Sequence, residues 1–184
     1  AWLTRQAEET GFPTGIVGFA DLSSPNVQGL LEAHAEFSRF RGVRHMLNWD
    51  TLPGRSFAEH GDHMSSEQWR SGFALLARMG LRFDMQIWPN QMLEATGLVA
   101  SHEDARVALN HTGFPIDRDA ASMQLWRDGM RALASQPNVF VKISGLGMLD
   151  HQWTADSIRP IVLETIEIFG VDRCMFASNF PVDK

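Results

Sequence analysis

Six short apolar runs alternate with six helix-like segments along the chain, and this alternation limits the fold more than any other feature of the sequence. The runs expected to be strands are residues 15–20, 41–47, 81–88, 106–111, 139–144 and 173–178. The expected helices are residues 1–9, 24–37, 65–80, 90–100, 119–135 and 154–169. Strands that alternate with helices of this length predict βα units around a parallel sheet.

Two α/β architectures fit this pattern, an open doubly wound sheet and a (β/α)8 TIM barrel. No glycine-rich phosphate-binding loop follows any of the strands, which disfavours a dinucleotide-binding doubly wound sheet. A complete barrel has eight strands and typically about 250 residues. A chain of 184 residues with about six strands therefore predicts one partial barrel domain over residues 1–184.

Both ends of the sequence read as if the chain continues beyond them. Residue 1 is not Met, residues 1–10 have the pattern of a helix interior, and the last residues follow a strand directly. We therefore expect N-terminal strands and a C-terminal helix outside this sequence. Because a barrel without two strands has open edges, we expect the 184 residues alone to be unstable or to form a homo-oligomer.

The composition argues against several classes of partner. The formal net charge is −6, and no cluster of Lys and Arg suggests a nucleic-acid surface. No apolar stretch approaches the ~18 residues that span a bilayer, and we expect no signal peptide. The single Cys174 excludes an internal disulfide and favours a reducing, cytoplasmic setting. These features leave a small-molecule substrate as the expected partner, with no nucleic acid and no membrane.

Polar side chains alternate with apolar ones in the expected strands, and in a barrel the polar set points inward. This face carries Arg44 in the second run, Asp84, Gln86 and Trp88 in the third, and Lys142 in the fifth. Lys142 either contacts a substrate or pairs with an inward carboxylate such as Asp84. Trp88 either stacks on a ring-shaped ligand or packs in a loop. We predict Arg44, Gln86, Trp88 and Lys142 as substrate-binding residues.

Histidines mark two further positions. His111 ends the fourth apolar run just before Thr112-Gly113-Phe114-Pro115, so it is either a site residue or a turn residue at a strand end. The long loop of residues 48–64 is of a length that is usually functional or mobile. It contains His60-Gly61-Asp62-His63, whose side chains can bind metals, although this spacing in a loop is a weak signal.

Four motifs, in matching order, resemble those of the amidohydrolase-related TIM-barrel hydrolases. They are Arg41-Gly42-Val43-Arg44-His45, Asn110-His111-Thr112-Gly113-Phe114-Pro115, Val141-Lys142-Ile143-Ser144-Gly145-Leu146, and Phe169-Gly170-Val171-Asp172-Arg173 with Met175-Phe176-Ala177-Ser178-Asn179-Phe180-Pro181. The resemblance covers residues 15–184. The nearest branch is that of the sugar-lactone and dicarboxylate lactonases. One such motif alone is weak, but four in order are fairly specific for the superfamily.

The resemblance implies a hydrolase that opens a lactone or related ester-like bond of a small sugar- or carboxylate-type substrate by adding water. It implies one divalent, zinc-like metal ion or none, and no organic cofactor. The strand-six histidine of the family falls on His111, which would orient or polarise the reacting group, or bind the metal. Arg44 and His45 would hold a carboxylate or the carbonyl oxygen, a task that suits a planar guanidinium.

The sequence departs from the family pattern at two places. The His-x-His of the first family strand is not in this chain. The final-strand acid falls on Asn179, a neutral amide that can hydrogen-bond substrate or water but cannot act as a general base. We take His111 and Asn179 as the catalytic pair, with Asp183 as the nearest carboxylate. Two alternatives remain open: decarboxylation of an aromatic or unsaturated acid, and a non-catalytic barrel that binds a small acid.

Overall fold

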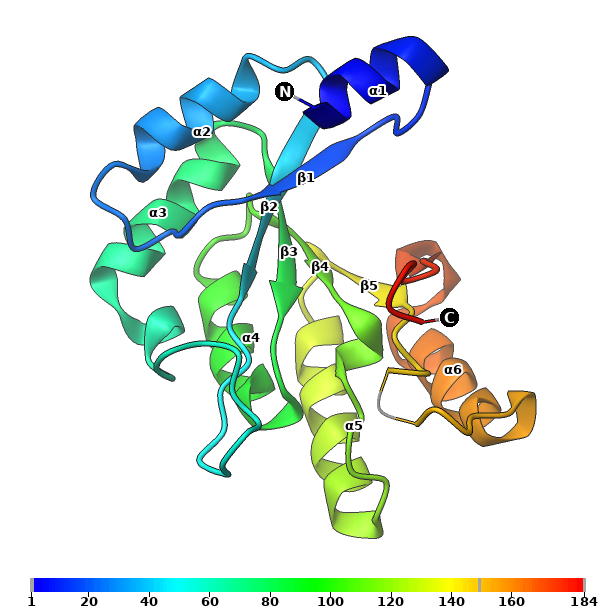
Figure 1. Ribbon diagram of the computed structural model, residues 1–184. Coiled ribbons are helices and arrows are strands. Elements are labelled where there is room, and N and C mark those ends of the chain that lie inside the picture. The colour runs from blue at the N-terminus through cyan, green and yellow to red at the C-terminus, as the bar shows by residue number, and fades with distance from the viewer. Residues whose placement is uncertain (1, 149, 184) are drawn as a thin grey trace.

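The computed structural model describes residues 2–148 and 150–183, arranged around one sheet of six parallel strands (Figure 1). The strands are β1 (Ile16–Phe19), β2 (Phe40–Met46), β3 (Arg82–Gln86), β4 (Arg106–Leu109), β5 (Val139–Ile143) and β6 (Cys174–Phe176). The α-helices are α1 (Trp2–Thr10), α2 (Val27–Ala35), α3 (Glu67–Arg78), α4 (Met92–Ala100), α5 (Ala120–Ala134) and α6 (Ala155–Phe169). Short 3-10 helices are η1 (His63–Ser65), η2 (Pro89–Gln91), η3 (His111–Gly113) and η4 (Val171–Arg173).

Each strand pairs in parallel with the strand that precedes it in the sequence, so the sheet order is β1-β2-β3-β4-β5-β6. Helices α2 to α6 follow the strands and lie along one side of the curved sheet (Figure 1). A doubly wound sheet would reverse its strand order and carry helices on both faces. The structure therefore confirms the predicted α/β class, and its six βα-linked strands correspond to part of a (β/α)8 barrel.

The side of the sheet that faces the helices is the apolar core. Val43, Phe83, Val107 and Val139 form one row across β2 to β5, and each is at most 1% exposed. The rings of Trp69 and Phe73 in α3 pack on Phe83 at centroid distances of 5.7 and 5.3 Å. Burial of such side chains drives the sheet and the helices together.

Side-chain caps explain where three of the helices begin. The hydroxyl of Ser66 accepts a hydrogen bond from the amide of Trp69 at the start of α3. The carboxylate of Asp119 accepts from two amides at the start of α5. Thr154 and Ser157 form a reciprocal capping box before α6. Each cap satisfies amides that have no partner within the helix.

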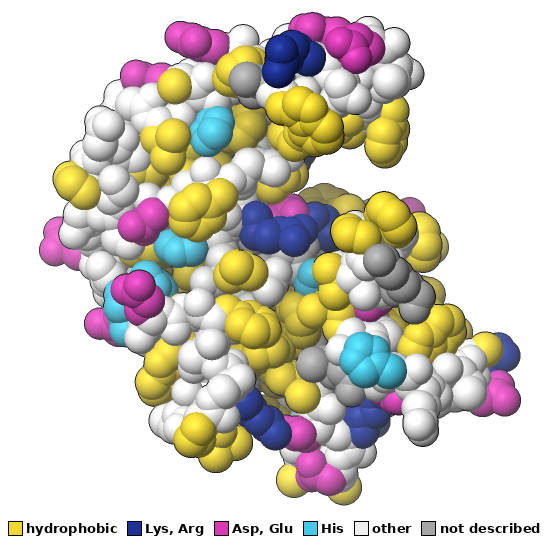
Figure 2. All heavy atoms as spheres, in the orientation of Figure 1, with side chains coloured by type: hydrophobic (Ala, Val, Ile, Leu, Met, Phe, Trp, Pro, Cys, Tyr) yellow, Lys and Arg dark blue, Asp and Glu magenta, His cyan; other side chains and the backbone are white. Residues whose placement is uncertain are grey.

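The other face of the sheet carries the polar row predicted from the sequence and also some exposed apolar side chains. Phe19, Met46 and Met175 on this face are 64%, 47% and 38% exposed, and Phe176 at the β6 edge is 85% exposed. Figure 2 shows apolar side chains on the concave side of the molecule. None of the helices in the described ranges combines the length and apolar character needed to cross a membrane.

Candidate active site

Three charged side chains form a row on the face of the sheet that points away from the helices. Arg44 lies beside Asp84 in register, and Lys142 reaches the same carboxylate from β5. Asp84 Oδ2 accepts from Arg44 Nη2 at 3.0 Å and from Lys142 Nζ. Figure 2 shows basic and acidic side chains together near the middle of the concave face. Arg44 and Lys142 therefore share the inward face, as the sequence predicted.

Asp84 is the residue of this row that we did not include among the expected site residues. Its side chain is only 6% exposed, whereas those of Arg44 and Lys142 are 39% and 18% exposed. A carboxylate buried between two cations holds both in place and leaves the group with one net positive charge. That charge faces the side of the sheet where a substrate carboxylate or a developing oxyanion would be bound.

His111 lies at the carboxyl end of β4, on a turn with unusual backbone geometry. His111, Thr112, Gly113 and Phe114 have φ values of 55°, 57°, 66° and 52°. Three of these four residues are not glycine, and such conformations persist only where surrounding contacts enforce them. Backbone strain of this kind is concentrated at functional sites, which favours a site role for His111 over that of an ordinary turn residue.

Contacts from β5 and α5 hold this turn. The hydroxyl of Thr112 donates to the carbonyl oxygen of Ser144 at 3.1 Å, and the buried indole N–H of Trp126 donates to the carbonyl oxygen of Thr112 at 2.8 Å. The ring nitrogen Nδ1 of His111 lies 3.0 Å from the Ser144 hydroxyl. Gly145 follows with φ +67°, and a Cβ there would come within 2.8 Å of His111 Cγ and Nδ1. The imidazole is thus fixed by residues of the segment that directly follows β5.

The electrostatic surroundings keep His111 neutral. Burial, followed by the nearby cations of Arg44 and Lys142, lowers the pKa of the His111 imidazole to about 4, against the opposing effect of the carboxylates of Asp183 and Asp84. At neutral pH the ring therefore has a free lone pair on one nitrogen and an N–H on the other. Such a ring can orient a polar group or bind a metal, but it is a weak general base.

Asn179 and Asp183 come together in a turn after β6. Asn179 has φ 53°, and its carbonyl oxygen accepts from the amides of Val182 at 2.8 Å and Asp183 at 3.2 Å. One amide atom of Asn179, Nδ2, is buried without a partner in the described part of the chain, and so is Asp183 Oδ1. Since the Asp183 charge acts on His111, this turn brings a carboxylate back towards the histidine.

The remaining expected site residues lie in different environments. Gln86 is 5% exposed on the inward face, in register with Met46. His45 lies on the opposite face of β2 from Arg44, and its Nδ1 accepts from the indole N–H of Trp69 at 3.2 Å. The structure therefore does not bring His45 into the row of Arg44, Asp84 and Lys142. It lines a separate cavity beside β1.

Trp88 connects the long loop of residues 48–62 to the turn that holds His111. Its indole N–H donates to the carbonyl oxygen of Arg55 at 2.7 Å, and its ring packs on Phe57 and Phe114 at 5.4 and 5.0 Å. The Phe114 ring in turn contacts His111 at 4.9 Å. Trp88 is 4% exposed, so in this structure its ring packs against the loop.

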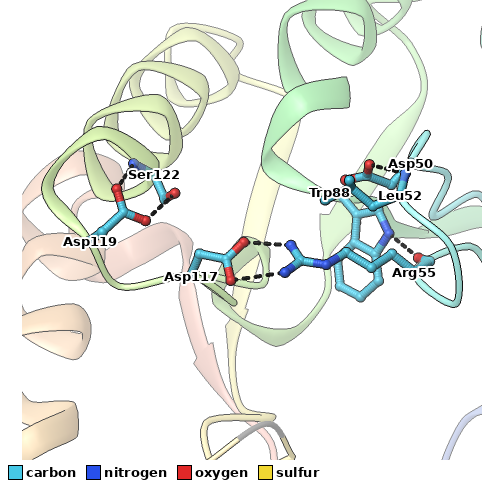
Figure 3. Close-up of polar contacts among 7 residues, drawn as sticks. All are labelled: Asp50, Leu52, Arg55, Trp88, Asp117, Asp119 and Ser122. Carbon is cyan, nitrogen blue, oxygen red and sulfur yellow. Dashed lines mark hydrogen bonds and ion pairs between the residues drawn. The ribbon is translucent and has the colours of Figure 1, made fainter.

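Arg55 ties the same loop to the segment after β4. Its guanidinium makes two hydrogen bonds to the Asp117 carboxylate, at 2.5 and 3.1 Å. Figure 3 shows these two groups facing one another, with Trp88 beside them and Asp119 capping α5 nearby. Within the loop, the Asn48 carbonyl oxygen accepts from the amides of Phe57 and Ala58 at 2.9 and 3.1 Å. The loop is therefore fastened both internally and to the β4 side of the site.

The described residues do not make a metal site on their own. Across residues 2–148 and 150–183, no group of three or more His, Cys, Asp or Glu side chains is arranged to hold a metal ion. His111 and Asp183 are the metal-capable groups near the charged row, and two side chains are fewer than the three protein ligands usual at catalytic zinc. We derive no chemical step through a metal.

Comparisons with known proteins agree with the family resemblance and with the fold. A family model described as Amidohydrolase (Amidohydro_2) matches residues 2–184. An uncharacterized protein of Sinorhizobium fredii, y4mH, is 46% identical over 183 residues, which is 100% of this chain and 61% of the relative. An L-fucono-1,5-lactonase of Burkholderia multivorans is 30% identical over 195 residues, covering 99% of this chain and 62% of the lactonase.

A solved structure supports the same relationship. The crystal structure of an amidohydrolase from Burkholderia multivorans with bound zinc superposes with a TM-score of 0.83 at 26% identity. The match covers 98% of this chain and 63% of that protein. The chain therefore spans less than two thirds of the length of each of these relatives.

Proposed function

The chain belongs to the amidohydrolase family, and from its polar row we propose that the protein hydrolyses a lactone or a related ester-like bond in a small substrate. The observation that carries the proposal is a neutral, fixed His111 at the carboxyl end of β4, near the Arg44–Asp84–Lys142 row on the inward face of the sheet. This end of the strands is where TIM-barrel enzymes carry out their chemistry. The name of the Burkholderia lactonase supports the choice of bond.

The charged row suits the electronic demands of this reaction. When water adds to a lactone carbonyl, the carbonyl oxygen gains negative charge before the ring C–O bond breaks. Arg44 and Lys142 supply N–H donors for that oxygen, and Asp84 fixes both donors beforehand. Removal of one donor of an oxyanion site typically costs about 2.7–4 kcal/mol in the transition state. The same donors would hold a substrate carboxylate.

Water must also lose a proton, and Asn179 cannot accept one. We assign this role to Asp183, whose carboxylate lies near His111 and has one buried oxygen without a partner in the described ranges. Asn179 would form the turn that presents Asp183 and offer its amide to substrate or water. His111 would orient the reacting group. With this assignment the site still contains a carboxylate, although Asn179 occupies the position of the final-strand acid of the family.

A divalent metal belongs to the proposal only if other parts of the complete protein supply the remaining ligands. If a metal is bound in the complete protein, His111 would supply one nitrogen ligand, and the ion would contribute Lewis-acid chemistry. No organic cofactor is required for this reaction. We also propose a cytoplasmic setting, because the single Cys174 leaves no internal disulfide to form. The partner would be a small molecule, and the 184 residues alone would self-associate through their open sheet edges.

The test is product analysis with the complete protein. Ring opening of L-fucono-1,5-lactone at neutral pH yields a hydroxy acid and releases a proton, which a pH indicator records. A decarboxylase would instead release CO2 from an unsaturated or aromatic acid without opening a lactone. Proton release that depends on Arg44 and His111 is the expected result. Carbon dioxide release without lactone opening, or acid binding without any turnover, would overturn the proposal.

A further inference from the structure

A cavity of about 310 Å³ lies at the carboxyl ends of β1 and β2, next to the charged row but separate from it. Arg44, Asp84, Lys142 and His111 do not line this cavity. Its polar and aromatic lining includes Phe19, Asp21, His45, Phe57, His60 and His63. Met46, two residues beyond Arg44 on the same face of β2, also lines the cavity, so the cavity begins one step along this strand from the row.

His45 presents an N–H donor to the cavity, and its contact with Trp69 shows which ring nitrogen carries the proton. The indole N–H of Trp69 can only donate, so His45 Nδ1, 3.2 Å away, must be an acceptor. A neutral imidazole carries one N–H, which therefore lies on Nε2. Burial and the neighbouring His63 lower the pKa of His45 to about 4, so the neutral ring persists at pH 7. No partner for Nε2 is found in the described part of the chain, which leaves this donor for a ligand.

Acceptors lie close to that donor. The Asp21 carboxylate is held through Oδ1 by the amide and hydroxyl of Ser23, at 2.8 and 2.6 Å. Burial would raise the pKa of Asp21, but the Ser23 bonds and the nearby His45 and His63 keep it below its usual value. His63 is 91% buried, and its Nδ1 has no partner among the described residues. The His45 and His63 rings lie 5.2 Å apart.

Aromatic rings complete the cavity. Phe19 and Phe57 are 64% and 53% exposed, and Phe19 packs edge-on against His45 at 5.7 Å. Among the lining residues that the structure describes, the ones with a formal charge are Asp21 and Glu59, and neither Lys nor Arg is present. A buried anion would therefore be repelled, in contrast to the neighbouring row, which carries a net positive charge.

We propose that this cavity binds the hydroxyl-bearing part of a neutral ring, so that His45 and Asp21 select a hydroxylated substrate for the charged row. A hydroxyl group both accepts and donates, which matches the His45 N–H and the Asp21 carboxylate acceptor, and His63 Nδ1 adds a further unpaired polar atom among the described residues. An ammonium group only donates and would leave His45 Nε2–H without a partner. Phe19 and Phe57 offer faces for the C–H surface of a ring. The inference rests on the proposed function, because it concerns the same substrate.

Two substitutions at His45 separate recognition from structure. His45→Asn places an amide oxygen near Nδ1, so Trp69 keeps its acceptor, but the donor into the cavity is lost. His45→Gln places an amide N–H near Nε2 and removes the acceptor for Trp69. His151→Asn, at an exposed histidine outside the cavity, is the matched control. If His45 is only structural, activity on a hydroxylated substrate should fall in His45→Gln. If His45 recognises the substrate, that activity should fall in His45→Asn.

The kinetic measurement uses two lactones of equal ring size in the complete protein. One is L-fucono-1,5-lactone, which carries hydroxyls, and the other is δ-valerolactone, which has none. We expect His45→Asn to lower kcat/KM for the hydroxylated lactone at least tenfold, because a polar site discriminates by its hydrogen bonds. The kcat/KM for δ-valerolactone should stay within twofold of the wild-type value. His45→Gln should have the smaller kinetic effect and the lower melting temperature. Equal losses on both lactones would overturn the inference.

A binding measurement separates failure of this inference from failure of the proposed function. Saturation-transfer NMR with free L-fucose, a hydroxylated ring that cannot be hydrolysed, reports occupancy without turnover. We expect a signal for the wild type, His45→Gln and His151→Asn that is lost in His45→Asn. If neither lactone is hydrolysed but this pattern holds, the proposed reaction is wrong and the cavity assignment stands. No L-fucose signal in the wild type, or an equal signal in His45→Asn, would refute the cavity assignment.

Discussion

The imidazole of His111 lies directly against the backbone of Gly145, where an added Cβ would approach His111 Nδ1 to 2.8 Å. Gly145→Ala should therefore push the ring from its place near Ser144 and lower turnover by roughly tenfold to 100-fold, since small displacements of catalytic groups have effects of that size. Gly80→Ala is a matched control, because Gly80 has the same φ of +67° and nothing within 4 Å of its Cβ position. Equal turnover in the two variants would show that the contact with His111 is irrelevant.

His111→Asn should lower turnover by about 10²–10⁴-fold with little change in melting temperature. Asn is the appropriate replacement because it tolerates the left-handed backbone that His111 adopts. Turnover and thermal unfolding are measured on the same preparation. Full turnover, or a loss of activity that merely follows unfolding, would favour a structural histidine.

Arg44→Ala should impair substrate use far more than Arg39→Ala. Arg44 is bound to the Asp84 carboxylate on the inward face, whereas Arg39 donates to the carbonyl oxygens of Gly11 and Pro13. Because Arg44 is 39% exposed, we expect the low end of the 2–5 kcal/mol range for a charged partner, or roughly 30-fold in kcat/KM. Steady-state kinetics of both variants test this, and similar values would remove Arg44 from the site.

Stability should fall as the pH drops from about 6.5 towards 4. Burial and His63 lower the pKa of His45 to about 4, with Asp21 opposing and His60 reinforcing the shift. The unfolded chain therefore takes up a proton in this range before the folded one does, so unfolding becomes easier. Protonation of Nδ1 would also remove the acceptor of Trp69.

The expected loss from this single group is on the order of 2–3 kcal/mol between pH 7 and pH 4. Urea unfolding at several pH values measures it. In His45→Asn the group no longer titrates, so the slope over this range should become smaller. An unchanged slope in that variant would mean that other groups control the acid dependence.

Arg55→Gln should loosen the loop of residues 48–62 without unfolding the sheet. The substitution removes the two hydrogen bonds to Asp117, while Trp88 still donates to the carbonyl oxygen of residue 55. Faster amide hydrogen exchange of Phe57 and Ala58, whose amides bond to the Asn48 carbonyl oxygen, is the expected result. Arg159→Gln, which removes a surface pair 3.7 Å from Asp156, should leave this exchange unchanged. Equal exchange in both variants would show that Arg55 does not fasten the loop.

The sequence alone predicted the strands, the helices and the inward face, because these depend on local periodicity. The alternation in β2 and β5 placed Arg44 and Lys142 on one side, as observed. The same alternation places His45 on the opposite face of β2 from Arg44, although we expected both side chains to hold the carboxylate or carbonyl oxygen of the substrate. The cavity role of His45 depends on Trp69, which is 24 residues away in the sequence, so no local pattern could reveal it.

The turn at His111 and the position of Asp183 also depend on distant contacts. Gly113 and Pro115 signal a turn, but four successive left-handed residues require Ser144 and Trp126 to hold them. Asp183 approaches His111 because of the turn after β6. The sequence did indicate Asp84 as an inward carboxylate that could pair with Lys142, and this pair is observed; that Asp84 also binds Arg44 follows from the pairing of β2 with β3.

The strictly consecutive strand order has a consequence for synthesis of the chain. Each strand pairs with the one made just before it, so a strand leaving the ribosome finds its partner already translated. Chains are made at about 5–20 residues per second, which is slow compared with loop closure in about 10–100 nanoseconds and collapse within about 100 microseconds. The sheet can therefore grow one βα unit at a time from the N-terminus, and the charged row is complete once β5 delivers Lys142 to Asp84.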